Sequence, residues 1–201
     1  YDKDPYMVVS DDGQLYWMID AYTTSSYYPY TEPYAGQLNY IRNSVKVVVN
    51  AYDGNVSFYI VDPEDPVVMT MAKIFPKLFK SVEQMPQDLY KHIRYPKSLF
   101  EVQAEMYTKY HMKDVSVFYQ GEDQWDIANE IYGQETTQMD SNYFIMSLPG
   151  STEEEFLLTI SYTPISKNNM TGMLIARCDG EHYGELKLYR MPKGKTVYGP
   201  A

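Results

Sequence analysis

The sequence has little of what metal centres and disulfide frameworks are built from. The 201 residues include one cysteine, Cys178, and three histidines, His92, His111 and His182. One cysteine cannot form a disulfide within the chain, and histidines this far apart lack the paired spacing of a zinc site. We therefore expect neither a metal centre nor a cofactor.

Positive charge and long apolar runs are also scarce. Lys and Arg total 17 against 27 for Asp and Glu, so the net charge is −10. An acidic chain offers no basic footprint for phosphates, which disfavours nucleic acid as a partner. No run approaches the roughly 18 apolar residues of a membrane-spanning helix. We expect no direct membrane insertion by this segment.

Motifs for nucleophilic or phosphate chemistry are missing as well. The sequence has no G-x-S-x-G, no S-x-x-K and no Gly-rich phosphate loop. A glycoside hydrolase needs two carboxylates about 5–9.5 Å apart, and sequence cannot select two from 27 acids. The acidic stretch 62–65 could bind calcium, but it lacks the EF-hand pattern. A turn followed by a helix N-cap at Asp65 explains this stretch better.

One nucleophile candidate remains at the end of a predicted strand. Cys178 follows Arg177, and His182 lies four residues further on. A neighbouring cation lowers the pKa of a thiol, so Cys178 and His182 could form a reactive thiol site. No third group is in view to orient the histidine, and a lone cysteine is more often a buried structural residue.

Tyrosine is the most over-represented residue, with 22 in the chain. Four of these tyrosines crowd a polar, proline-containing stretch over residues 23–34, which we predict to be a long loop. Exposed tyrosines offer rigid contact area for a protein, peptidoglycan or polysaccharide. The alternative is that the rings pack over neighbouring hairpins. The candidate binding residues, including those at the two ends of the loop, are Asp20, Tyr22, Tyr27, Tyr28, Tyr30, Tyr34 and Arg42. Binding by this loop requires at least three of its rings to be exposed together.

Hydrophobic periodicity predicts strands, then helices, then strands. Alternating apolar residues around Asp12-Gly13 and Asp53-Gly54 predict two hairpins in the N-terminal third. Apolar spacing predicts helices from Pro66, from about Pro86, from a capping box at Ser98 and over 123–131. Strands are predicted again at 143–148, 156–162, 172–178 and 185–191. This order indicates an α+β fold, with a mainly antiparallel sheet from the two outer thirds and a helical insertion at about 65–132. We expect one domain over 1–201.

Several strings of residues are the most specific feature of the sequence. They are Asp20-Ala21-Tyr22-Thr23-Thr24, residues 39–46, Ala51-Tyr52-Asp53-Gly54, Arg94-Tyr95-Pro96, Tyr110-His111-Met112, Ala176-Arg177-Cys178-Asp179-Gly180 and Val197-Tyr198-Gly199-Pro200. On these strings the chain resembles uncharacterised protein family 0182, a group of large bacterial membrane proteins. It departs from the family pattern at Asn50, where an aspartate is expected, and over 120–141. The first departure weakens any chemical role for a carboxylate at that position.

The resemblance implies a multi-pass parent protein in the cell membrane, with this chain in a domain outside the cytoplasm. It implies no activity. The start at Tyr1, without an initiator methionine, fits a segment of a longer chain. We expect a non-catalytic domain that binds an envelope protein or polysaccharide, or the remainder of its own membrane protein. The alternatives are a cell-envelope enzyme acting on glycans or peptides, and a structural scaffold that packs on the rest of the parent.

Overall fold

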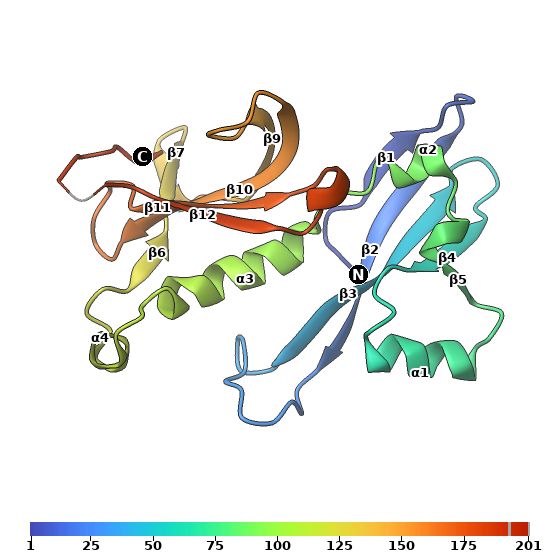
Figure 1. Cartoon of the computed structure of the whole chain (residues 1–201), viewed down its shortest axis with the longest axis horizontal. Coiled ribbons are helices and arrows are strands. Elements are labelled where there is room, and N and C mark those ends of the chain that lie inside the picture. Colours follow the sequence, from blue (N-terminus) through green and yellow to red (C-terminus); the bar gives the residue numbers. More distant parts are fainter. Residues whose placement is uncertain (193, 201) are drawn as a thin grey trace. The chain divides into compact units, whose positions relative to one another are not determined.

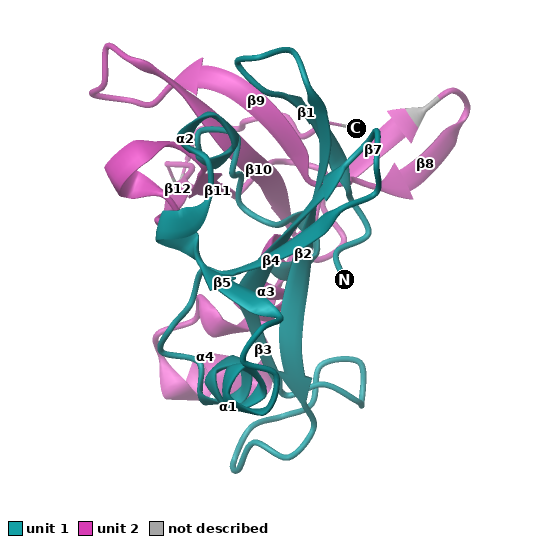
Figure 2. Ribbon diagram, turned by 90° about the vertical axis from the view of Figure 1, so that its right-hand side faces the viewer, with its two compact units in different colours: residues 1–99 teal, residues 100–201 magenta. Residues whose placement is uncertain are grey.

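The chain forms two compact units in a computed structural model that describes residues 1–192 and 194–200, and only the backbone of Tyr132. Unit 1 spans Tyr1–Leu99 and unit 2 spans Phe100–Ala201, and Figure 2 colours them separately. Both units combine antiparallel strands with a few helices, which confirms the predicted α+β class. The expectation of a single domain stays a prediction.

Unit 1 is built on a five-stranded sheet in the order β1-β2-β3-β4-β5 (Figure 1). The strands are β1 (Tyr6–Val9), β2 (Leu15–Ser25), β3 (Tyr40–Asn50), β4 (Val56–Ile60) and β5 (Phe79–Ser81). The first four pair antiparallel, and β5 adds in parallel to β4. Both predicted hairpins form, with Gly13 and Gly54 at positive φ in their turns.

One face of this sheet packs against helix α1 (Pro66–Ile74). Val68 of the helix is buried with Val45 and Val47 of β3, and Phe58 and Ile60 of β4 pack at the edge of this cluster. The period-two pattern of β3 sends these valines to one face and leaves the intervening residues for the other.

The opposite face packs against the short helix α2 (Gln87–Tyr90) and the turn before it, the 3-10 helix η1 (Val82–Gln84). Met85 and Leu89 are buried there with Met18, Val48 and Tyr59. Helices at both faces explain why β3 carries five consecutive buried residues in place of a strict alternation.

Unit 2 contains a second five-stranded antiparallel sheet and a separate hairpin. The sheet consists of β6 (Trp125–Ile127), β9 (Asn142–Ser147), β10 (Glu154–Pro164), β11 (Gly172–Arg177) and β12 (Leu186–Arg190). The hairpin pairs β7 (Asn129–Tyr132) with β8 (Glu135–Gln138). Helix α3 (Lys97–Tyr110) packs on β10, where the Tyr162 hydroxyl donates to the carbonyl of Ala104 at 2.9 Å. The other elements are α4 (Val115–Gln120) and the 3-10 helix η2 (Gly180–His182).

Two local predictions in the middle third were wrong. The stretch 123–131 forms β6 and β7, because Trp125 to Ile127 pair with the end of β10 and tertiary pairing overrides a weak helical pattern. Ser98 does not open a capping box. It lies inside α3, and its N–H donates to the carboxylate of Asp2.

None of the helices in the described ranges combines the length and apolarity that crossing a bilayer requires.

Candidate functional site

The tyrosine-rich loop lies between β2 and β3 and covers residues 26–39, which we call the aromatic loop. It starts later than predicted, because Thr23, Thr24 and Ser25 still pair with β3, up to the partner of Ser25 at Tyr40. A register shift at Ala21 and Tyr22 lets the paired ribbon continue past the core. The loop therefore sits at the far end of a two-stranded extension (Figures 1 and 2).

Hydrogen bonds within the aromatic loop fix its shape. Asn39 accepts from the N–H of Tyr28 at 3.0 Å and donates to the carbonyl of Tyr28 at 2.8 Å. The hydroxyl of Thr31 donates to the same carbonyl. Tyr30 has a φ of 59°, a left-handed conformation that costs energy in a non-glycine residue and needs surrounding contacts to persist.

Three rings of the aromatic loop are exposed together. Tyr27 is 90% exposed, Tyr28 is 52% exposed, and Tyr30 is fully exposed. Tyr28 also stacks on Tyr40, with ring centroids 5.7 Å apart and planes within 18°. Binding by this loop requires at least three rings to be exposed together, and these three are. The role of these residues in binding stays a prediction.

A buried aspartate anchors the loop to the helix layer. Asp65 caps the N-terminus of α1 through the N–H groups of Val67 and Val68. Its carboxylate also accepts from the hydroxyls of Ser44 at 2.5 Å, Thr23 at 2.6 Å and Tyr40 at 2.8 Å. Because the Tyr40 ring stacks on Tyr28, contacts link the N-terminus of α1, through Asp65 and Tyr40, to the exposed ring of Tyr28.

These contacts change the acidity of Asp65. Burial alone would raise the pKa of Asp65, but hydrogen bonds from Ser44, Thr23 and Tyr40 outweigh burial and lower it to about 2. The ordinary value is 3.8. The difference corresponds to a contribution of about 2 kcal/mol to folding above pH 4.

Acidification is expected to remove this contribution between pH 4 and pH 2. Asp65 in the unfolded chain takes up a proton near pH 3.8, whereas in the folded chain it stays ionised to about pH 2. Stability from this group is therefore lost as the pH falls through that window. Urea unfolding at pH 5, 4, 3 and 2 should show that Asp65→Asn loses about 2 kcal/mol less than the unmodified chain. Parallel pH profiles for the two proteins would contradict this prediction.

The other predicted loop residues lie in different surroundings. Asp20 is buried and pairs with Lys46, directly across from it on β3, so its carboxylate is not presented at the loop surface. Tyr22 is half-buried and donates to Asp2. Tyr34 is half-buried in a bridge to Leu38. Arg42 forms an ion pair with Asp62 at 2.7 Å.

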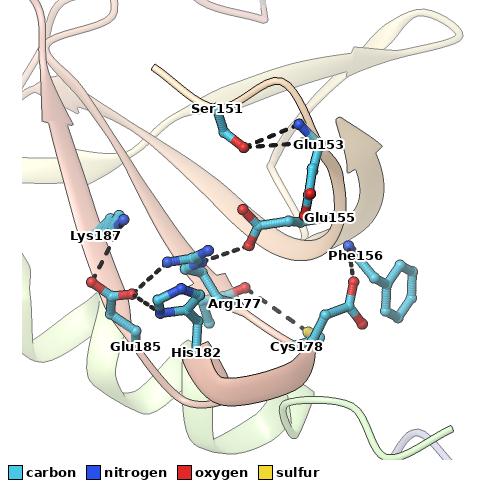
Figure 3. Close-up of polar contacts among 11 residues, drawn as sticks. Ser151, Glu153, Glu155, Phe156, Arg177, Cys178, His182, Glu185 and Lys187 are labelled. Carbon is cyan, nitrogen blue, oxygen red and sulfur yellow. Dashed lines mark hydrogen bonds and ion pairs between the residues drawn. The ribbon is translucent and has the colours of Figure 1, made fainter. Parts of the chain in front are cut away.

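The candidate thiol is buried. Cys178 is 3% exposed, and its thiol lies 3.9 Å from the carbonyl of Ala176 as a weak donor. Figure 3 shows His182 directed at Glu185, with 3.4 Å between its Nδ1 and the carboxylate. Burial disfavours the charged thiolate, which is the reactive form of a cysteine. The buried position of Cys178 therefore weighs against a reactive thiol.

Arg177 does not serve the thiol either. Its Nε donates to Glu155 at 2.6 Å and its Nη1 donates to Glu185 at 2.7 Å, so two carboxylates neutralise it (Figure 3). Hydrogen bonding to Arg177 also holds the pKa of Glu185 below its usual range. Successive strand residues point to opposite faces, which explains why adjacency in sequence does not bring the guanidinium to the thiol.

Within the described ranges, no group of three or more His, Cys, Asp or Glu side chains is arranged to hold a metal ion. Asp62 and Asp65, the aspartates of the acidic stretch, instead hold Arg42 and the α1 terminus.

Sequence reasoning missed the residues that shape the aromatic loop. Asn39 and Tyr40 lie five and six residues beyond the end of the predicted loop at Tyr34, and only the fold shows that they hold Tyr28. A side-chain amide and a ring carry no local signal for such a contact, because their partner lies 11 or 12 residues away.

Comparison with known proteins gives a family and relatives. The model of the Uncharacterised protein family (UPF0182) matches residues 1–201. The UPF0182 protein of Alkaliphilus metalliredigens is 55% identical over 201 residues, covering 100% of this chain and 22% of the relative. That of Moorella thermoacetica is 52% identical over 200 residues, covering 100% and 22%. The chain thus spans about a fifth of the length of these relatives. No solved structure matches it.

Proposed function

The chain belongs to the Uncharacterised protein family (UPF0182), and from that premise we propose that it is the extracytoplasmic, non-catalytic part of a longer membrane-anchored protein and binds a protein partner through the aromatic loop. The relatives, about five times as long as this chain, support a larger parent. The observation that carries the proposal is the joint exposure of Tyr27, Tyr28 and Tyr30 on a hydrogen-bonded loop.

The composition of the loop favours a protein surface as its partner. The run Ser25-Ser26-Tyr27-Tyr28-Pro29-Tyr30-Thr31 has no charged side chain and combines tyrosine with small hydroxyl residues. Antibody-like binding loops use this mixture, because tyrosine gives large contact area at low entropic cost. Tyrosine is also enriched among residues that dominate binding energy. The fixed conformation of Tyr28 and Tyr30 lowers the cost of ordering the loop on binding.

Cross-linking in intact cells is expected to capture a partner at the loop. A photo-cross-linking amino acid placed at Tyr27 or Tyr30 of the full-length protein should yield an adduct at least tenfold stronger than the same residue at Tyr119. Tyr119 of α4 is a matched control, because it is 91% exposed, against 90% for Tyr27. Digestion of the adduct by protease identifies a protein. A protease-resistant, glycanase-sensitive adduct, or equal yields at Tyr119, would overturn the proposal.

Two checks separate binding from folding and test the compartment. Tyr27→Ala with Tyr30→Ala should change the free energy of unfolding by no more than about 0.5 kcal/mol, since both rings lie in solvent. Tyr30→Cys should react with a membrane-impermeant maleimide in intact cells, while the native, buried Cys178 of this chain stays unlabelled. Labelling of Tyr30→Cys only after lysis would contradict an extracytoplasmic position.

A further inference from the structure

The sheet face that packs against α1 is only partly covered. Cross-strand register arranges this face in rows, and the row Ile19, Val47 and Phe58 packs with the helix. Beyond it, toward the hairpin turns, Val49 still packs at the edge of this cluster, whereas Met7, Val9, Trp17 and Val56 are exposed. We call these residues the open apolar face: Met7, Val9, Leu15, Trp17, Val49 and Val56.

The open apolar face exposes large side chains on otherwise well-packed strands. Val9 is 58% exposed, Met7 48%, Val56 44% and Trp17 38%. Val47, two residues before Val49 on the same face of β3, is buried. Val47 is buried because α1 packs over its row, whereas the rows nearer the hairpin turns extend past the helix although their residues are also apolar. Figures 1 and 2 place α1 toward the aromatic-loop end of the strands and the two hairpin turns at the other end.

Negative charge borders the open apolar face. The turn between β1 and β2 carries Asp11 and Asp12, and the turn between β3 and β4 carries Asp53, all exposed. Both turns lie at the same end of the sheet, since Tyr16 pairs with Asn50. Neither turn, 10–14 or 51–55, contains a Lys or Arg. An apolar patch with a polar rim is typical of an interaction site.

We propose that a basic amphipathic helix, from the part of the longer protein outside these 201 residues, packs on the open apolar face. The inference rests on the proposed function only for the existence of that longer protein. A helix is about 10 Å wide, which suits two rows about 7 Å apart, and α1 already packs this way on the adjoining rows. Lysines or arginines flanking its apolar stripe complement the three aspartates.

The dimensions and the chain length available both fit this occupant. The row Met7, Trp17, Val49 and Val56 crosses four strands about 4.8 Å apart and is some 14 Å long, which matches about three helical turns, while Val9 and Leu15 widen it at one end. The relatives are matched over only 22% of their length, so most of the longer protein lies outside this chain. A strand from another sheet is a poorer match, because strands add to a sheet edge and this patch is a sheet face. An anionic lipid surface is a poorer match, because the rim of the patch is acidic.

Cross-linking within the full-length protein tests the proposal. A photo-cross-linking residue at Val9 or Val56 should form an intramolecular adduct, at least tenfold stronger than one from Ile165. Ile165 is a matched control in unit 2, with 46% exposure against 44% for Val56. Mass spectrometry should place the adduct in a segment with apolar residues at i, i+3 and i+4 spacing, flanked by Lys or Arg. An adduct with a second copy, with lipid, or with an acidic segment would overturn the proposal, as would no adduct.

Two substitutions test the apolar and the charged parts separately. Val56→Asp should reduce the Val9 adduct about tenfold, and Asp11→Lys should reduce it several-fold. The adduct from Tyr30 should persist in both variants, which shows that unit 1 is folded. An unchanged Val9 adduct in both would overturn the proposal. If the protein without these substitutions forms no adduct from Tyr30, partner binding by the aromatic loop is contradicted, but helix packing on the open apolar face is not. The two proposals can therefore fail independently.

Discussion

Replacing Asp65 with alanine is expected to lower the free energy of unfolding of unit 1 by about 2–4 kcal/mol. The side chain is completely buried and accepts from three hydroxyls and two backbone N–H groups. Loss of a helix cap accounts for about 1 kcal/mol. The three hydroxyls together add about 1–3 kcal/mol, because Thr23 and Tyr40 are only partly buried and the Thr23 and Ser44 hydroxyls lie 3.2 Å apart. Urea unfolding, followed by circular dichroism, measures the change.

Asp114 provides the matched control for this prediction. It caps α4 through the N–H groups of Ser116 and Val117, but it is exposed, and these capping contacts stay within its own helix. Asp114→Ala should cost only about 1 kcal/mol. Equal losses for Asp65→Ala and Asp114→Ala would show that Asp65 acts as a helix cap alone. Asp65→Ala should also weaken the ordering of the aromatic loop, because Tyr40 loses its anchor.

Replacing Lys46 with methionine should cost about 3–5 kcal/mol. Lys46 and Asp20 are both buried, face each other across β2 and β3, and form an ion pair. Lys46 also donates to the carbonyl of Arg94 at 3.0 Å. Removing the cation leaves the buried carboxylate of Asp20 without its charge partner. This uncompensated buried charge accounts for most of the expected loss in stability.

The double variant distinguishes desolvation from packing. Lys46→Met with Asp20→Leu removes both charges and should return to within about 2 kcal/mol of the unmodified chain. If the double variant is as unstable as Lys46→Met alone, the loss of stability comes from lost packing and hydrogen bonds of the pair and not from an uncompensated charge. Arg42→Met is the control on the same strand. Arg42 pairs with Asp62 near the surface and should contribute no more than about 1 kcal/mol.

The cost of Lys46→Met should also depend on pH. Burial raises the pKa of Asp20, and Lys46 opposes that rise. Without Lys46 the folded chain takes up a proton on Asp20 at higher pH than the unfolded chain does. The variant therefore regains stability as the pH falls toward the ordinary pKa of an aspartate.

Local patterns in the sequence were sufficient where neighbours along the chain supply the contacts. Alternating valines around Asp53-Gly54 predicted a hairpin, because both strands and the turn lie within about 20 residues. Asp65 followed by Pro66 predicted the start of α1 for the same reason. The strands of the last third also formed near their predicted bounds.

The α+β class, a tyrosine-rich loop and the family could thus be reached from the amino-acid order, since hydrophobic period, composition and shared strings are properties of the chain itself. Only the tertiary structure decided that 123–131 pairs as strands, that Asp20 is sealed against Lys46, and that Cys178 faces the interior. It also decided that three loop tyrosines are exposed, that Asp65 supports the aromatic loop, and that part of one sheet face lies open. Each of these depends on groups far apart in sequence, whose approach is set by which strands pair and which faces a helix covers.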